Sequence, residues 1–539
     1  MESEPLKDIQ SKVAISPKRS NYKTSSQFEG ANGLSAPDSH RNPTFLDVMP
    51  QIIAACISLS SVPQAGVNMA FSGVLIPQLK DEGMVGFSKE AASWIASIVA
   101  ISQPIGALFV GPLMDAIGRK SVCIITNIPI VIGWLFIYFT KSELWPIYVG
   151  RMLCGFGSGM TTVGIVYTAE VAHSRYRPML LSLNSVNVAL GILLATVLGA
   201  YLSWRTCALV FGAMGIISTT MSLFIPESPL WLVNFTESSR ELIAKHVRSL
   251  NRSEWLFAEE WDRLQESKAT RRTAVQEEQE KAKSIFQRLK GKIACFFEPA
   301  SFRPLTTLFI VFFLQQTSGT YVVIFYTVNI FRAVGGDDFG GGFDGYTATM
   351  ALGILRFVMS FVSAVLSNVM GRRPIMLVSC VGMGLSSLAT ALFLSLNHVD
   401  TVIFASGGSV NATASAAAPG ADQLVSSWWV LISLLIFVCI GSVGQMVIPW
   451  TLIGELLPTK IRASGSGLMV SYSSLLLFSV VKTFPGLLDL TTLPVLFLSY
   501  ATMSFVSALY VYFCLPETFR KNFQEIAQMF KTKNVAIND

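Results

Sequence analysis

Three sequence markers occur twice along this chain, in the same order in each half. The first is a Gly-Arg pair in a polar turn between two apolar stretches. The second is a glutamate followed seven positions later by an arginine, and the third is the tripeptide P-E-S or P-E-T. The markers are residues 111–120, Glu170 with Arg177 and residues 226–228 in the first half, and residues 368–373, Glu455 with Arg462 and residues 516–518 in the second. This ordered repetition predicts two copies of one structural unit.

Twelve apolar stretches, each long enough to cross a bilayer, surround these markers. A helix needs about 20 mainly apolar residues to span a membrane. Only 14% of the residues are charged, against about 25% in soluble domains. The predicted spans are residues 48–73, 91–112, 120–140, 146–169, 179–201 and 205–225, then 304–331, 346–369, 374–396, 427–455, 462–488 and 493–514. We therefore expect an all-α membrane protein with twelve transmembrane helices in two pseudo-symmetric six-helix bundles, an architecture of secondary transporters.

The polar segments divide the chain and set its orientation. The expected parts are a disordered tail at 1–47, bundles at 48–225 and 304–514, a helical linker at 226–303 and a second tail at 515–539. The first tail has no apolar core, which argues against a cleaved signal peptide. Lys and Arg gather in the short loops on one side, and such loops stay in the cytosol. Both termini are thus expected in the cytosol, with the plasma membrane as the expected location. The net charge of +6 indicates anionic lipid rather than nucleic acid as a partner.

Two long polar segments carry further expectations. The linker has apolar residues at helical intervals, which indicates short amphipathic helices. It is either a solvated connection or a latch that bridges both bundles. The loop at 397–426 falls outside the cell and contains Asn411 in an N-A-T sequence, the acceptor pattern for N-glycosylation.

Acids and arginines at the span ends are candidates for conformational gating. Arginine holds a carboxylate through two parallel hydrogen bonds and stays charged, so such pairs could tie the bundles together in one state and break in the other. The alternative is that these charges only set topology. The candidates are Asp115, Arg119, Arg151, Glu170, Arg177 and Glu227 in the first half, and Arg372, Glu455, Arg462 and Glu517 in the second. Where the first half has Asp115, the second has Asn368, so we expect the two halves to contribute unequally.

Several other functions find no support in the sequence. The eight cysteines show no CxxC spacing and the four histidines are scattered, so we expect no metal site. No nucleophile and base are spaced as in an enzyme, and no cofactor is expected. The G-x-G-x-G run at 155–159 lies inside an apolar span, where small residues serve helix packing.

The motifs together resemble those of the sugar porters of the major facilitator superfamily, over roughly residues 50–525. The matching segments are residues 111–120, 150–151, 167–170, 226–232, 315–319, 371–373, 449–450 with Glu455, and 516–518. The end of the first span, residues 70–77, is similar to the facilitated trehalose transporter branch. The resemblance implies a membrane transporter fold and a sugar as substrate.

The resemblance also implies a central sugar site. By position, Gln315 and Gln316 match the family's paired glutamines and Trp450 its tryptophan in the tenth span. Amides donate and accept hydrogen bonds at once, which suits vicinal hydroxyls, and an indole offers an apolar face with a donor at its edge.

At other family positions this chain departs from the pattern. Ser185 stands at the position of the glutamine in the fifth span, Tyr321 at that of an asparagine in the seventh, and Arg356 at that of an asparagine in the eighth. These three residues are also candidates for substrate contact, but the changes bring a hexose or trehalose substrate into question.

Arg356 has two interpretations. A charged group near the bilayer centre costs about 2.5–3.5 kcal/mol, so it faces protein or water. It is either a cavity cation that favours an anionic or strongly polar substrate, or it has an internal partner such as a carbonyl or the ring of Tyr321 or Tyr326.

The first span offers Asn68 and no carboxylate, whereas proton coupling calls for an acid whose pKa shifts with burial. The leading hypothesis is therefore a facilitative transporter of a hexose or trehalose, working by alternating access. The alternatives are a transporter-like sugar sensor, motivated by the altered site, and a porter of an organic anion, motivated by Arg356.

Overall fold

The computed structural model describes residues 43–532 except for residues 85, 87, 237, 282–293, 326–344, 397–420, 459–460, 520 and 522. Every regular element in the described residues is a helix. Asn411 and Tyr326 lie outside the described residues.

Eight helices occupy the six spans predicted for the first half. They are α1 (Met49–Ser58), α2 (Pro63–Asp81), α3 (Lys89–Ile117), α4 (Arg119–Tyr138), α5 (Trp145–Met160), α6 (Thr162–Val171), α7 (Arg177–Tyr201) and α8 (Trp204–Ser222). The first span is interrupted before Pro63, which begins α2, because proline lacks the N–H needed inside a helix but fits its first turn. The fourth span is interrupted at Thr161.

The second half repeats this arrangement. Its helices are α13 (Pro299–Thr317), α14 (Thr320–Phe325), α16 (Gly345–Val369), α17 (Arg372–Leu396), α18 (Ala421–Val443), α19 (Ile448–Leu456), α20 (Arg462–Leu490) and α21 (Leu493–Cys514). Its first span is interrupted at Ser318–Gly319 and its fourth between α18 and α19, before Pro449. Interruptions of the first and fourth spans in both halves support the internal repeat inferred from the markers.

Ten of the predicted spans, counted over the described residues, are long and apolar enough to cross a membrane. The other two positions are filled by α8 and by α13 with α14. Aromatic side chains pack at the centre of the first half, where the rings of Phe71, Trp134 and Phe211 lie 5.0–6.0 Å apart. The result is an all-helical membrane fold.

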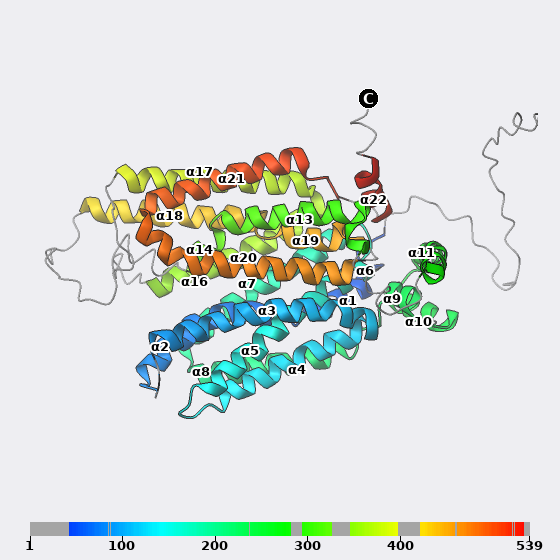
Figure 1. Cartoon of the computed structure of the whole chain (residues 1–539), viewed down its shortest axis with the longest axis horizontal. Coiled ribbons are helices and arrows are strands. Elements are labelled where there is room, and N and C mark those ends of the chain that lie inside the picture. Colours follow the sequence, from blue (N-terminus) through cyan, green and yellow to red (C-terminus); the bar gives the residue numbers. More distant parts are fainter. Residues whose placement is uncertain are drawn as a thin grey trace, which may run out of the picture. The chain divides into compact units, whose positions relative to one another are not determined.

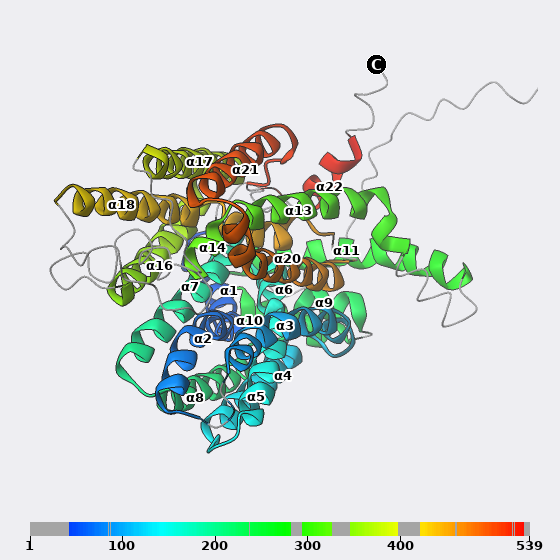
Figure 2. The same ribbon diagram turned by 60° about the vertical axis from the view of Figure 1, so that its left-hand side comes forward.

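The two halves meet along two helix pairs, α3 with α20 and α7 with α16. Figures 1 and 2 show helices α2–α5 and α8 on one side of this junction and α13 and α17–α21 on the other. At Gly467 of α20 the backbones approach so closely that a Cβ would overlap the carbonyl oxygen of Ala107. Ser471 donates a hydrogen bond of 2.7 Å to the carbonyl of Pro104. These contacts hold α20 against α3 through a close backbone approach and a side-chain hydrogen bond.

The linker forms α9 (Pro229–Phe235), α10 (Arg240–Leu250) and α11 (Glu254–Lys281), which enclose a small apolar cluster around Trp231, Val247 and Leu264. It is attached to the first half, since Trp231 donates to the carbonyl of Asp115 at 3.1 Å and Gln51 donates to Asn251 at 2.8 Å. The last helix, α22 (Phe523–Thr532), packs against α13 and α19. The interpretation of the linker as a latch that joins both bundles stays a prediction.

Candidate functional site

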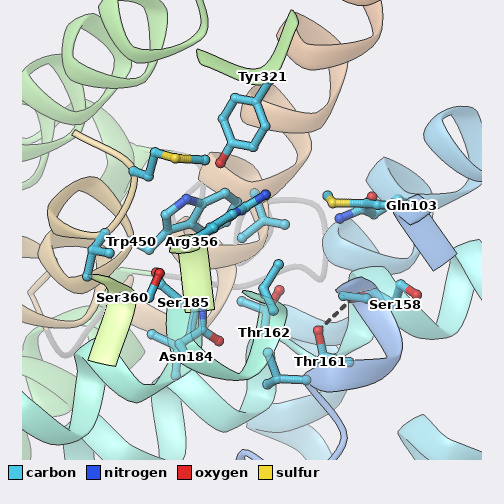
Figure 3. A pocket seen from close by; sticks show the side chains of 18 residues that line it. Gln103, Ser158, Thr161, Thr162, Asn184, Ser185, Tyr321, Arg356, Ser360 and Trp450 are labelled. Carbon is cyan, nitrogen blue, oxygen red and sulfur yellow. Dashed lines mark hydrogen bonds between the residues drawn. The ribbon is translucent and has the colours of Figure 1, made fainter. Parts of the chain in front are cut away.

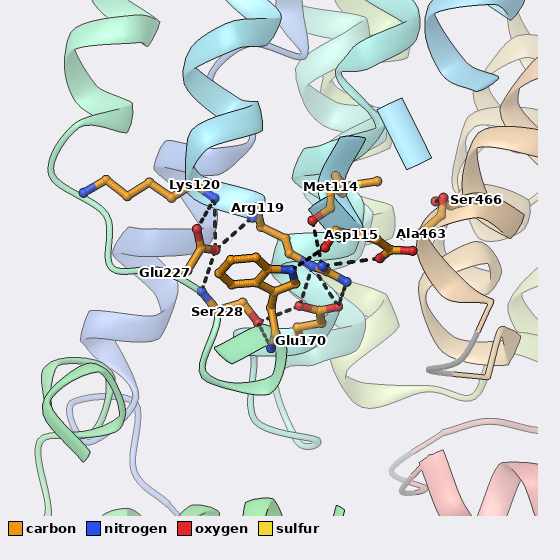
Figure 4. Close-up of polar contacts among 10 residues, drawn as sticks. Met114, Asp115, Arg119, Lys120, Glu170, Glu227, Ser228, Ala463 and Ser466 are labelled. Atoms are coloured by element: carbon orange, nitrogen blue, oxygen red, sulfur yellow. Dashed lines mark hydrogen bonds and ion pairs between the residues drawn. The ribbon is translucent and has the colours of Figure 1, made fainter. Parts of the chain in front are cut away.

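The first duplicated marker folds into a buried ion-pair cluster, which we call the first corner (Figure 4). Arg119, at the start of α4, holds Glu170 of α6 through Nε at 3.0 Å and Nη2 at 2.9 Å. Its Nη1 donates to the carbonyl of Met114 at 3.0 Å and lies 3.5 Å from Asp115. Arg119 is only 1% exposed, so its charge is neutralised by protein groups rather than by water.

The P-E-S tripeptide completes this corner. Glu227 accepts the backbone N–H of Arg119 at 2.8 Å and that of Lys120 at 3.1 Å, which satisfies donors left free at a helix N-terminus. Ser228 donates to Glu170 at 2.6 Å. Gly118 before them has φ of 93°, and a Cβ there would collide with the Glu227 carboxylate. The Gly-Arg pair is thus needed for both charge and close approach.

The second marker folds into the same arrangement, the second corner. Arg372 holds Glu455 through Nη2 at 2.6 Å and Nε at 3.2 Å, and its Nη1 donates to a carbonyl of α16 at 2.9 Å. Glu517 accepts the backbone N–H of Arg372 at 2.9 Å. Thr518 donates to Glu455 at 2.6 Å. Each hydrogen bond has its counterpart in the first corner, so the repeat extends to atomic detail.

The two corners differ at the position expected from the sequence. Asp115 lies beside Arg119 and on the side of α3 that faces Ala463 of α20 (Figure 4). Asn368 cannot supply this charge, and its Oδ1 is buried without a hydrogen-bond partner in the described part of the chain. Ser228 and Thr518, which complete the corners, were not among the predicted gating residues, although both stand in the repeated tripeptide.

The arginines of the E-x6-R spacing link the corners to each other. Arg177 donates to the carbonyl of Ala172 at 3.0 Å, and Arg462 donates to that of Leu457 at 3.3 Å. Each guanidinium also interacts electrostatically with the glutamate of the opposite half, Arg177 with Glu455 and Arg462 with Glu170. We call the end of the molecule where these groups meet the corner end.

Arg151 is placed differently from the grouping suggested by the sequence. It lies near the middle of α5 and donates to the carbonyl of Asn68 at 3.1 Å, to that of Ile95 at 3.4 Å and to Ser72. Its guanidinium also lies 5.8 Å from the ring centre of Phe71. These contacts hold α5 to α2 and α3 and involve no residue of either corner.

A small cavity lined by both polar and apolar side chains lies between the two halves (Figure 3). Its volume of about 50 Å³ leaves room for a few water molecules. Its polar lining is Gln103, Ser158, Thr161, Thr162, Asn184 and Ser185 from the first half, and Tyr321, Arg356, Ser360 and Trp450 from the second. Both halves therefore contribute hydrogen-bonding groups to one site.

Four predicted substrate contacts line this cavity, namely Ser185, Tyr321, Arg356 and Trp450. The guanidinium of Arg356 lies 6.0 Å from the ring centre of Tyr321. Its Nη1, and Oγ of Ser185, are buried without a hydrogen-bond partner among the described residues. The interpretation of Arg356 as partnered by Tyr321 and its interpretation as a cavity cation are thus compatible.

The paired glutamines, Gln315 and Gln316, lie away from this cavity. Gln315 donates to the carbonyl of Gln445 at 2.7 Å, and Gln316 donates to Ser473 at 2.9 Å. Both are fully buried and neither lines the cavity. In this arrangement they join α13 to α18–α19 and to α20 inside the second half. The cavity instead presents Gln103, Asn184 and Ser360, which the sequence signals only as polar residues inside apolar spans.

The lining offers hydrogen-bonding groups that suit a ligand rich in hydroxyls, together with one cation, Arg356. Amides and hydroxyls can each donate and accept, and the Trp450 indole adds an apolar face. Among the described residues, no Asp or Glu lines the cavity. The described residues also contain no cluster of His, Cys, Asp and Glu able to hold a metal ion.

Comparison with known proteins identifies the family to which the chain belongs. A family model described as "Sugar (and other) transporter" matches residues 53–530. The chain is 27% identical over 485 residues to the facilitated trehalose transporter Tret1 of Apis mellifera ligustica, covering 89% of this chain and 88% of the relative. It is 28% identical over 490 residues to Tret1 of Polypedilum vanderplanki, covering 90% and 88%. It spans 55% of the length of Tret1 of Aedes aegypti.

Two solved structures share the fold. The proton:xylose symporter XylE bound to 6-bromo-6-deoxy-D-glucose superposes with a TM-score of 0.72 at 18% identity, covering 90% of this chain and all of that one. The inward open conformation of XylE from E. coli gives 0.59 at 18% identity, covering 88% and 98%.

Two helical bundles with a cavity between them and matched ion-pair corners define a secondary transporter of the major facilitator superfamily. Within that class, the chain belongs to the sugar transporter family. It is an integral membrane protein and not an enzyme.

Proposed function

We propose that the chain is a facilitative transporter of a hexose or trehalose that works by alternating access. The observation that carries this proposal is the small cavity at the junction of the halves, whose lining includes neutral hydrogen-bonding groups from both halves and one cation, Arg356. Relatives named as facilitated trehalose transporters support the same substrate class.

In this mechanism the sugar binds between the first-half groups Gln103, Asn184 and Ser185 and the second-half groups Tyr321 and Trp450. Because the cavity is only about 50 Å³, the halves must separate to admit a sugar. Gln315 and Gln316 would reach the substrate only if α13 or its side chains rearrange as the site opens, and otherwise they act as internal braces.

The corners act as the gate. Arg119 with Glu170 and Arg372 with Glu455 are buried while α3 packs on α20. Opening the corner end would expose these pairs to water, where an ion pair contributes only about 0–1 kcal/mol. The difference between the closed and open environments would set the balance between the two states.

The cavity lining favours uniport over proton coupling. None of the described residues that line it is an acid, and a proton-coupled mechanism needs a carboxyl that changes its protonation state during the cycle. Asn68 stands in the first span and donates to Ser158 at 2.8 Å and to the carbonyl of Cys154 at 3.3 Å. The amide of Asn68 forms hydrogen bonds to its neighbours but, unlike a carboxyl, does not take up or release a proton.

We further propose that the corner end faces the cytosol and that the protein resides in the plasma membrane. The support is the concentration of Lys and Arg at this end, as positive loops remain cytosolic. The same orientation would place Asn411 outside the cell, where it could be glycosylated.

The test is uptake by vesicles that contain the purified chain, with radiolabelled glucose, trehalose and a sugar acid, with and without a pH gradient. Sugar uptake that is the same in both conditions is expected. Uptake that requires an inward proton gradient would contradict facilitated diffusion. Binding without uptake of any of the three would favour the sensor hypothesis over transport.

A second candidate function, a porter of an organic anion, is favoured by Arg356. Its Nη1 is buried, faces the cavity lining and has no hydrogen-bond partner among the described residues. Carboxylates bind guanidinium groups strongly. Preferential uptake of the sugar acid, lost in Arg356→Gln, would support this candidate; preference for the neutral sugars in both proteins would reject it.

A further inference from the structure

A second cavity, larger than the central one, lies at the corner end between α1, the end of α8 and α10. Its volume is about 560 Å³. One wall is apolar and includes Ile53, Ile57, Phe224 and Ile225. Phe224 is 80% exposed and Ile53 is 51% exposed. Phe224 lies two residues after the end of α8, so this wall adjoins one of the helices that occupy the predicted spans.

The lining of this cavity also includes basic residues. It carries Lys120, Lys245 and Arg252. In the described part of the chain none of the three forms an ion pair with a carboxylate. The histidine of the lining, His246, accepts the backbone N–H of Glu227 at 3.2 Å. Three cations therefore face one cavity without a matching acid.

We propose that this cavity binds an anionic phospholipid from the leaflet at the corner end. The headgroup phosphate lies against Lys245 and Arg252, and an acyl chain lies along Ile53 and Phe224. The basic residues alone would suit any phosphate group. The apolar wall, however, is matched only by a ligand that also has a hydrocarbon chain. The proposal depends on the membrane fold and not on the identity of the transported substrate.

The site adjoins the first corner. Lys120 contributes its side chain to the lining and its backbone N–H to Glu227, at 3.1 Å. The backbone N–H of Glu227 in turn bonds to His246 of the same lining. A bound lipid thus contacts the residues that hold Glu227 at the start of α4, and it would favour the conformation in which this corner is formed.

The test is native mass spectrometry of the full chain, purified in detergent, with phosphatidylinositol 4-phosphate or phosphatidylcholine added. The unaltered protein is expected to retain the anionic lipid and not the zwitterionic one. Two cations at a membrane surface contribute about 1 kcal/mol each, so retention should fall roughly tenfold or more in K245Q/R252Q. The single variant Lys245→Gln should show a smaller loss and guards against misfolding of the double variant.

The matched control is R240Q/K268Q, which removes two charges from α10 and α11 outside the cavity and should retain the lipid. Glycerophosphoinositol 4-phosphate, which carries the headgroup without acyl chains, should not displace it. Equal retention by K245Q/R252Q and the unaltered protein would overturn the proposal. Displacement by the soluble headgroup would also overturn it, because the site would then be one for free phosphate esters.

Discussion

At the scale of single residues, the corners are buried ion pairs whose partners cannot be removed independently. Arg372 is 0% exposed and Glu455 is 5% exposed. Loss of one partner of a buried pair leaves an uncompensated charge, which costs about 3–5 kcal/mol. Exposed pairs contribute far less, about 0–1 kcal/mol. The corners should therefore be sensitive to changes that surface charges tolerate.

We expect Glu455→Gln to lower both transport and the melting temperature, because Arg372 keeps its buried charge and loses the carboxylate. Transport in vesicles and thermal unfolding in detergent measure the two effects. The control is Glu254→Gln, which removes the acid of an exposed pair with Arg248, whose side chains are 67% and 68% exposed. Normal transport by correctly folded Glu455→Gln would contradict the gating role.

The unequal corners give a reciprocal pair of variants. Asn368→Asp should add a carboxylate four residues before Arg372, as Asp115 stands before Arg119 at 3.5 Å. We expect a higher melting temperature and slower transport, because the closed corner end is stabilised. Asp115→Asn should shift both quantities in the opposite direction. Shifts of the same sign in the two variants would contradict the proposed equivalence.

His173, between α6 and α7, should make the corner end sensitive to acid. Burial, and then the charges of Arg177, Arg263 and Arg175, lower its pKa to about 4, and its Nδ1 accepts the N–H of Arg175 at 3.2 Å. The folded protein holds the neutral imidazole, so this stability is complete above pH 6.5 and is lost as the pH falls towards 4. The difference in pKa corresponds to about 3 kcal/mol.

The expected result is a melting temperature that falls between pH 6.5 and 4, with a smaller fall in His173→Gln. Thermal unfolding across this pH range measures it. His246 is the comparison, because its pKa is also lowered, by burial and by Lys120 and Lys245. If His173→Gln and the unaltered protein lose stability equally, then His173 is not the group that titrates.

At the scale of helices, closure depends on how closely α3 and α20 can approach. At Gly467 a Cβ would overlap the carbonyl oxygen of Ala107. Gly486, on the same helix, has no atom within 4 Å of such a Cβ. A change from glycine to alanine should therefore disturb the packing of the two helices at Gly467 and be tolerated at Gly486.

We expect Gly467→Ala to push the two helices apart and to increase the population open at the corner end. The distance between spin labels on the corner ends of α3 and α20 measures this shift. Gly486→Ala should leave the distance unchanged and raise helix stability by roughly 0.5–1 kcal/mol. An unchanged distance in Gly467→Ala would mean that the interface adjusts without opening.

The helices themselves are largely predictable from the sequence, but the faces they turn to the cavity are not. Apolar length predicts the spans because a bilayer demands it. In α13, however, apolar residues surround the whole helix, so periodicity does not reveal which side meets the cavity. Gln315 and Gln316 illustrate this, since they bond inside the second half. Ser185, Tyr321, Arg356 and Trp450 do line the cavity.

At the scale of the whole molecule, the repeated corners and the cavity between the halves differ in how far the sequence predicts them. The corners are predictable because acid and arginine must meet wherever they are buried together. The cavity lining depends on tertiary contacts between five or more helices, and no local pattern encodes it. This explains why the sequence predicts the corners more completely than the cavity lining.

The completion of each corner by a downstream tripeptide has a consequence for biosynthesis. Ser228 and Glu227 are made soon after the first bundle, so the first corner can form while the second half is still on the ribosome. The second corner needs Glu517 and Thr518, whose partners Arg372 and Glu455 were inserted long before. Until translation reaches residue 518, Arg372 lacks the backbone hydrogen bond to Glu517 and Glu455 lacks the one from Thr518, and a nascent chain stalled there should be recognised as incomplete by membrane quality control.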